Sequence, residues 1–124
     1  MTLYVTSSFS LNMLEIEKVL CKWVHLYIDR ISPWRAREII EKSEDVVFAI
    51  GHESTAKLLS QLLGIEIKAE RKTIKLKHGD KLIIAQLMIR PPEGKVYTFQ
   101  ELLDLLSKNK IILLYIEYSE VYIP

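Results

Sequence analysis

The residues best suited to do chemistry form the run Ile50-Gly51-His52-Glu53-Ser54-Thr55, where a glycine turn leads into an amphipathic helix. The first turn of a helix carries unpaired N–H groups and the positive end of the helix dipole, so the backbone around Gly51 and His52 suits a phosphate. The His52 imidazole can transfer a proton near neutral pH, which suits general acid catalysis. A histidine that opens a helix is more often only a polar first-turn residue, so the motif alone leaves a structural role open.

Two arginines beside an expected β-hairpin supply positive charge. Residues 72–77 alternate apolar and polar side chains, residues 82–89 are nearly all apolar, and a turn around Gly79 joins them, which predicts a hairpin with one central strand. That hairpin would bring Arg71 and Arg90 to the same end. A guanidinium pairs two phosphate oxygens at once, so the two arginines can hold a phosphate, although arginines that flank strands are commonly only solvated.

Two polar loops add further candidates. Residues 91–95 form a stiff loop after the apolar strand, and its prolines fix the direction of Glu93, which can act on a ligand or simply be solvated. The turn at residues 7–10 offers the hydroxyl groups of Ser7, Ser8 and Ser10, of which Ser8 and Ser10 are the candidates for binding a ligand. These hydroxyls can bind a phosphate or ribose, or only satisfy the backbone, as they usually do.

The composition excludes several classes of function. A net charge of +1 argues against a protein that coats duplex DNA, because neutralising many phosphates needs a cationic excess. Cys21 is the only cysteine, which excludes an internal disulfide, and we expect it to be buried. The sequence contains no zinc-protease, Walker or nucleophile-elbow motif, and the spacing of its three histidines predicts no metal site and no cofactor. We expect no membrane segment and a cytoplasmic location.

The pattern of elements predicts an α/β (α+β) fold in which residues 1–124 form a single domain, with a mixed central sheet of about five strands and three or so helices. Residues 46–50 are either a short strand or a buried connection. Strands or extended segments are expected at residues 3–7, 19–28 with a break at 29–30, 72–77, 82–89 and 111–118. Helices are expected from Pro33 to about Ser43, from His52 to Gly64, and from the capping box Thr98-Phe99-Gln100-Glu101 to about Lys108.

Three blocks of the sequence together resemble a known family. Residues 9–14 (Phe-Ser-Leu-Asn-Met-Leu), 50–55 and 90–95 follow in the family's order, with an arginine before the strand-like residues 72–77. The chain therefore resembles the viral type III anti-CRISPR ring nucleases, small proteins of archaeal viruses, phages and some prokaryotic genomes. The resemblance implies a metal-independent homodimer that binds cyclic tetra-adenylate at a site shared across the dimer interface. It also implies cleavage to linear di-adenylate ending in a 2′,3′-cyclic phosphate, which antagonises type III CRISPR signalling.

The resemblance also implies roles for individual residues. His52 matches the family's general acid and Glu93 its active-site glutamate, which could orient His52 or raise its pKa. Ser10, Arg71 and Arg90 match positions that bind the ligand. Three positions depart from the family pattern, namely Ser7, Glu70 and Ile89. Two alternatives therefore stay open: a protein that binds a cyclic oligonucleotide without cutting it, and a viral regulatory or interaction domain.

Overall fold

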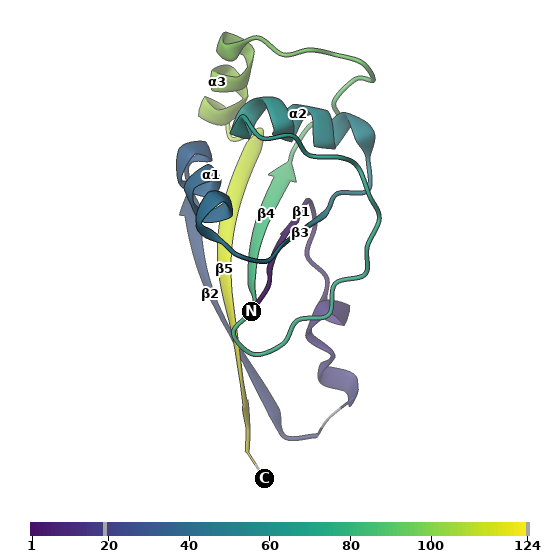
Figure 1. Ribbon diagram of the computed structural model, residues 1–124, viewed down its shortest axis with the longest axis vertical. Coiled ribbons are helices and arrows are strands. Elements are labelled where there is room, and N and C mark those ends of the chain that lie inside the picture. The colour runs from purple at the N-terminus through teal and green to yellow at the C-terminus, as the bar shows by residue number, and fades with distance from the viewer. Residues whose placement is uncertain (19, 124) are drawn as a thin grey trace.

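One mixed sheet with the strand order β2-β5-β4-β1-β3 forms the centre of the computed structural model, which describes residues 1–18 and 20–123 (Figure 1). Strand β1 pairs in parallel with β3 and β4, and β5 pairs antiparallel with β4 and β2. Across the described residues the five strands are β1 (Leu3–Thr6), β2 (Lys22–Ile31), β3 (Val46–Ala49), β4 (Lys81–Leu87) and β5 (Ile111–Tyr122). The expected α+β class with a five-stranded mixed sheet is confirmed.

Three α-helices occur in the described part of the chain, and local signals set their ends. Helix α1 (Pro33–Lys42) has the Ser32 side chain as its N-cap, and α2 (Glu53–Leu63) ends at Gly64, whose φ of 68° is left-handed. Helix α3 (Phe99–Ser107) begins with the expected capping box. Each expected helix is thus confirmed. None of these helices, as far as the chain is described, is long and apolar enough to cross a membrane.

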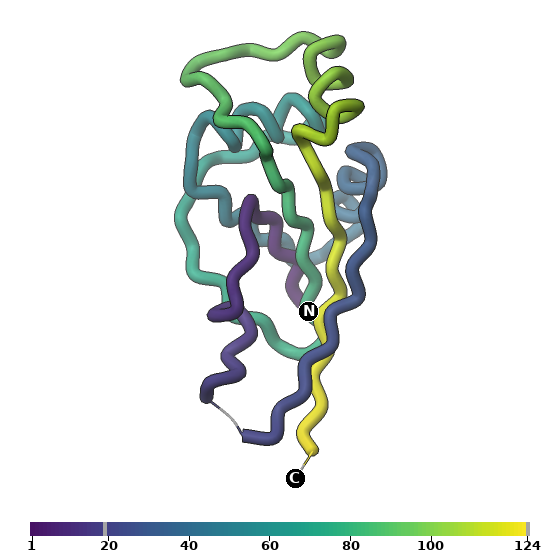
Figure 2. Tube along the Cα trace, turned by 180° about the vertical axis from the view of Figure 1, so that it is seen from behind, coloured from purple at the N-terminus to yellow at the C-terminus, as the bar shows by residue number. Residues whose placement is uncertain are grey.

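The sheet has an apolar layer on each face. All three helices pack on one face, where Ala36, Leu59 and Leu102 are buried against the side chains of β1, β4 and β5 (Figure 1). The other face is covered by the 3₁₀ helix η1 (Leu11–Leu14) and by the chain between α2 and β4 (Figure 2). A second 3₁₀ helix, η2 (Ile16–Lys18), follows η1 and buries none of its residues. Burial on both faces explains why β4 reads as a continuous apolar run.

The expected hairpin is wrong. Residues 72–77 form no strand, because β1 and β5 already pair with the two edges of β4. Instead this segment crosses the second face of the sheet, where Ile74 and Leu76 are buried and the Leu76 N–H donates to the Met13 carbonyl at 2.8 Å. The alternation therefore reflects one-sided burial rather than strand pairing.

Two smaller expectations are also corrected. Strand β2 does not break at Asp29 and Arg30, because these residues pair with Tyr115 and Leu114 of β5 and extend the strand to Ile31. Val19, expected at the start of this segment, lies outside the described residues. Cys21 is exposed rather than buried, at a turn residue with a φ of 63°.

Candidate functional site

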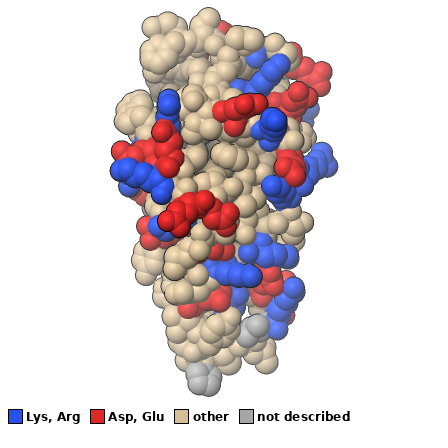
Figure 3. Space-filling model, in the orientation of Figure 1, with Lys and Arg blue, Asp and Glu red and all other residues tan. Residues whose placement is uncertain are grey.

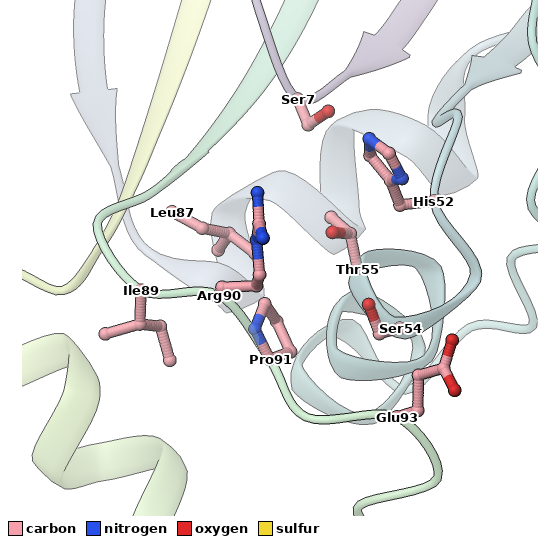
Figure 4. Close-up of a pocket in the computed structure, with 9 residues that line it drawn as sticks. All are labelled: Ser7, His52, Ser54, Thr55, Leu87, Ile89, Arg90, Pro91 and Glu93. Atoms are coloured by element: carbon pink, nitrogen blue, oxygen red, sulfur yellow. The ribbon is translucent and has the colours of Figure 1, made fainter.

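The candidate site lies where three strands end at the same edge of the sheet. Because β1, β3 and β4 are parallel, the residues that follow them come together: Ser7 after β1, the turn to His52 after β3, and Arg90 after β4 (Figure 4). In open α/β sheets, ligands commonly bind outside the carboxyl ends of such strands. The parallel pairing thus positions side chains that are far apart in the sequence.

A cleft of about 560 Å³ occupies this edge. In Figure 4 the His52 ring and the Arg90 guanidinium enter it from different walls, and the Ser7 hydroxyl lies beside the imidazole. Its lining residues are Ser7, His52, Ser54, Thr55, Leu87, Ile89, Arg90, Pro91 and Glu93. The cleft is within the size range of small-molecule sites and combines an acid–base group with a fixed positive charge.

His52 is the N-cap residue of α2, but its imidazole takes no part in capping. Its carbonyl accepts the Ala56 N–H at 3.0 Å, while no hydrogen bond from a side chain caps the helix among the described residues. The exposed ring therefore stays available to a ligand, and so do the N–H groups of the first turn. This is the arrangement that the motif predicted.

The Thr55 hydroxyl adds a donor that sequence reasoning did not single out. Thr55 is only 8% exposed and lines the cleft. Its hydroxyl is not one of the fully buried side-chain groups without a partner, of which the described residues have none, so we take it to face the cleft that Thr55 lines. Thr55 and the neighbouring Ser54 belong to the first turn of α2, so their hydroxyls lie next to its free N–H groups. Together they can hold an anion.

Arg71 comes close to His52 by a different route from the expected hairpin. The Glu70 N–H donates to the Ile50 carbonyl at 2.8 Å, which ties the segment after α2 to the end of β3. As a result the Arg71 side chain covers Gly51: a Cβ built on Gly51 would lie 3.2 Å from the Arg71 Cγ. Arg71 and Gly51 thus lie beside the cleft, next to His52, rather than among the residues that line it.

The loop that carries Arg90 and Glu93 is held against α2. Pro91 is buried, and the Gln61 side chain binds both backbone groups of Tyr97, accepting its N–H at 3.0 Å and donating to its carbonyl at 3.4 Å. The Lys95 ammonium is engaged by Glu101 at 2.7 Å, a contact that raises the pKa of Lys95 and lowers that of Glu101. The loop therefore has a defined position relative to His52.

The charged groups of the site are not neutralised by one another. Within residues 1–18 and 20–123, no ion pair includes Arg71, Arg90 or Glu93. The Glu93 carboxylate lies beyond Ser54 and points away from Arg90 in Figure 4. On the face that Figure 3 shows, acidic and basic side chains are interspersed. Arg90 thus brings to the cleft a positive charge that no ion pair among the described residues neutralises.

Ser8 and Ser10 do not line the cleft, whereas Ser7 does. The Ser10 hydroxyl accepts the Asn12 N–H at 3.1 Å and caps η1, and Ser8 is exposed. Ser7 shares the helix-covered face of the sheet with Leu3 and Val5, so the alternation along β1 predicts that it points to the cleft. That signal was present in the sequence.

Metal ligands are not gathered at this edge. Over the described part of the chain, no group of three or more histidine, cysteine, aspartate or glutamate side chains could hold a metal ion. The chemistry that the cleft can offer from its own residues is proton transfer by an imidazole, charge stabilisation by guanidinium groups and backbone N–H groups, and hydrogen bonding by hydroxyls.

Comparison with known proteins places the chain in a family. Residues 3–115 match the family described as STIV B116-like, so the chain belongs to that family. It is similar to uncharacterized protein 26 of Sulfolobus islandicus filamentous virus, with 40% identity over 60% of this chain and 62% of that protein. Uncharacterized protein ORF116 of Acidianus filamentous virus 1 is 32% identical over 64% of this chain and 68% of that protein. The chain thus spans less than two thirds of the first relative's length.

The fold agrees with a solved member of the family. B116 of Sulfolobus turreted icosahedral virus superimposes with a TM-score of 0.81 and 27% identity, covering 93% of this chain and 97% of that chain. These relatives are proteins of archaeal viruses, which accords with the viral family that the sequence blocks resemble. Their names state no activity.

Proposed function

We propose that this protein is a metal-independent ring nuclease that cleaves cyclic tetra-adenylate to linear di-adenylate ending in a 2′,3′-cyclic phosphate. One observation carries the proposal: the free His52 imidazole shares a cleft with the unpaired Arg90 guanidinium and the open first turn of α2. A phosphodiester bound there would meet a proton donor and cationic groups at once. The resemblance of three sequence blocks to anti-CRISPR ring nucleases supports the same activity.

The reaction needs no nucleophile from the protein. The ribose 2′-oxygen attacks the adjacent phosphorus, its proton passes to water, the P–O5′ bond breaks, and His52 gives its proton to the departing 5′-oxygen. The protein aligns the attack and stabilises the extra negative charge on the phosphate oxygens. Arg90, Arg71 and the first-turn N–H groups supply that stabilisation, with the Thr55 hydroxyl as a further donor.

The ring itself suggests how the protein is used. Cyclic tetra-adenylate repeats one nucleotide four times, so a twofold dimer can present the same cleft to each half of the ring. In this proposal two copies of the chain bind one ring across their interface, each with its own His52 and Glu93. Cutting at both clefts gives two di-adenylates, which removes the messenger and antagonises type III CRISPR signalling inside the infected cell.

The decisive experiment incubates labelled cyclic tetra-adenylate with excess protein in EDTA and resolves the products by chromatography. We expect the wild-type protein to produce linear di-adenylate, and His52→Ala to lose about 10²- to 10⁴-fold in rate while it still binds the ring. His25→Ala is the matched control, because His25 is exposed on β2, away from the cleft. Equal rates for wild type and His52→Ala would refute the proposed role of His52.

A capture protein that binds the ring without cutting it is the second candidate. The departures from the family pattern at Ser7, Glu70 and Ile89 favour it. Against it, the Glu70 carboxylate is exposed and pairs with Lys72 at 3.4 Å, so it leaves the Arg71 guanidinium free. An intact ring that co-elutes with the wild-type protein would identify capture. A protein that neither binds nor cuts the ring would instead be a regulatory or interaction domain.

A further inference from the structure

A second hollow adjoins the cleft and has a different character. It measures about 310 Å³ and shares His52, Ser54 and Glu93 with the cleft. Its other walls are Glu53 and Lys57 on α2, and Gly94 on the loop. The two hollows therefore meet at the residues that would act on the phosphate, and a ligand in one can continue into the other.

This second hollow, which we call the side groove, lies between one ridge of α2 and the loop at residues 91–97. Glu53, Lys57 and Gln61 are four residues apart on the helix and so form a single ridge. Gln61 fixes the loop at one end through its two hydrogen bonds with Tyr97. Near the other end, no atom lies within 4 Å of a Cβ built on Gly94, so the space beside that glycine is open. The groove is thus held open by contacts that need no ligand.

The charges of the groove do not favour a phosphate. Lys57 contributes one positive charge, while Glu53 and Glu93 contribute two negative charges, so even with a protonated His52 the groove has no excess of positive charge. No ion pair within the described residues includes Lys57 or Glu53, so each side chain keeps its hydrogen-bonding capacity for a ligand. The Lys57 ammonium can donate hydrogen bonds and the Glu53 carboxylate can accept them. This pair therefore suits a neutral ligand group that has both hydrogen-bond acceptors and donors. A nucleobase with ring nitrogens and an amino group has that pattern.

We infer that the side groove binds the nucleobase next to the scissile phosphate, with Glu53 accepting from its exocyclic amino group and Lys57 donating to its ring nitrogens. The inference rests on the proposed function, because the cleft must hold the phosphate for the base to enter the groove. Its volume is at the lower end of the range for small-molecule sites, which fits one base better than a larger ligand. Lys57 and Glu53 thereby set which base the protein accepts.

The test measures binding and single-turnover cleavage of two rings, cyclic tetra-adenylate and cyclic tetra-inosinate, which lacks the amino group. We expect the wild-type protein to bind the adenine ring about tenfold more tightly than the inosine ring. Glu53→Gln, whose amide can also donate, should reduce that preference to about twofold. Lys57→Met, which keeps the length of the stem, should weaken binding of both rings by about tenfold without changing the saturated cleavage rate or its pH profile.

Matched controls come from a third hollow, which is separate from the cleft and the side groove. Glu66→Gln and Lys68→Met remove the same groups from a hollow beside β3, and both should behave like the wild type. Variants at Glu53 and Lys57 that bind and cut both rings as the wild type does would overturn the assignment of the groove alone. A wild-type protein that neither binds nor cuts cyclic tetra-adenylate would overturn the proposed function and the groove with it.

Discussion

Arg71 packs directly over Gly51, so that a Cβ added to Gly51 would lie 3.2 Å from the Arg71 Cγ and 3.5 Å from its Nε. This contact joins the segment that follows α2 to the turn that precedes it. It explains the glycine by close approach, because Gly51 is not among the residues with positive φ in the described chain. Arg71 is therefore positioned by the residue next to the proposed general acid.

Gly51→Ala should weaken ring binding without unfolding the protein. The alanine backbone is tolerated at this φ, but the new methyl group displaces the Arg71 side chain by a few tenths of an ångström. We expect affinity for cyclic tetra-adenylate to fall between about threefold and tenfold, with the free energy of unfolding changed by about 0.5 kcal/mol or less. Isothermal titration and urea unfolding measure the two effects.

Two further variants test the reason for the Gly51 effect. In an Arg71→Ala background, Gly51→Ala should have no additional effect on binding, because the displaced group is gone. Gly64→Ala should instead lower the free energy of unfolding by about 1 kcal/mol and leave ring affinity unchanged, because Gly64 has a left-handed φ of 68°. Additive losses at Gly51 and Arg71 would contradict the steric explanation.

Gln61→Ala should slow cleavage although Gln61 does not line the cleft. The substitution removes both hydrogen bonds to Tyr97 and so releases the loop that carries Arg90 and Glu93. We expect a loss of about 1–2 kcal/mol in the free energy of unfolding and a fall in kcat, because a misplaced catalytic group is costly. Single-turnover rates and thermal unfolding measure the two changes.

Ser107→Ala on α3 is a suitable control for Gln61→Ala. It removes one exposed hydrogen bond, from the Ser107 hydroxyl to the Asp104 carbonyl at 2.9 Å, and leaves the loop untouched. We expect its cleavage rate to match the wild type. If Gln61→Ala loses stability but cuts the ring at the wild-type rate, the loop does not depend on Gln61 for its position.

The helix ends were predictable from the sequence because each depends on a few neighbouring residues. Ser32, Thr98 and Gly64 act within one turn of the helix that they begin or end, so their effect needs no knowledge of the rest of the fold. The same holds for His52 at the start of α2. The part of the site that follows from local capping was therefore foreseen.

The surroundings of His52 depend on pairing between distant segments, which local patterns do not specify. Residues 72–77 alternate as a strand would, yet alternation reports only that one side is buried and not which partner buries it. Arg71 was expected near Arg90 through a hairpin, but the bond from Glu70 to Ile50 brings it to Gly51 instead. Ser8 and Ser10 were favoured over Ser7 although the alternation from Leu3 and Val5 continues to Ser7, because the sequence does not show which face of β1 borders the cleft.

A largely buried cluster of Lys22, Tyr118 and Glu120 predicts how stability depends on alkaline pH. The Lys22 ammonium and the Glu120 carboxylate lie 2.9 Å apart with 6% and 14% of their side chains exposed, and Tyr118 donates to the same carboxylate. Burial, with the Glu120 carboxylate beside it, raises the pKa of Tyr118 to about 12. Burial lowers the pKa of Lys22 and is the largest single cause, but the hydrogen bonds and negative charges of Glu120 and Tyr118 together outweigh it, so the net shift is upward.

The raised pKa values of Tyr118 and Lys22 both make the fold less stable as the pH rises. An unfolded tyrosine loses its proton near pH 10 whereas Tyr118 in the fold keeps it to about pH 12, so the unfolded state binds fewer protons in that window and stability falls as the pH rises. Tyr118→Phe should cost about 1 kcal/mol at pH 7 through the lost hydrogen bond. That cost should shrink between about pH 10 and 12, because phenylalanine has no proton to lose.

Urea unfolding from pH 7 to 12 separates the contribution of Tyr118 from that of the other groups. The decline that persists in Tyr118→Phe belongs to the other groups whose pKa the fold raises, Lys22, Tyr4 and Lys95, because each of them stabilises the fold only at lower pH. On the acid side, Glu120 has a lowered pKa because hydrogen bonds from Tyr118 and Lys22 outweigh its burial, so stability should fall as the pH drops below about 4.5. If Tyr118→Phe and the wild type decline in parallel between pH 10 and 12, the Tyr118 phenol is not the group that titrates, and the buried cluster stabilises the protein only through Lys22 and Glu120.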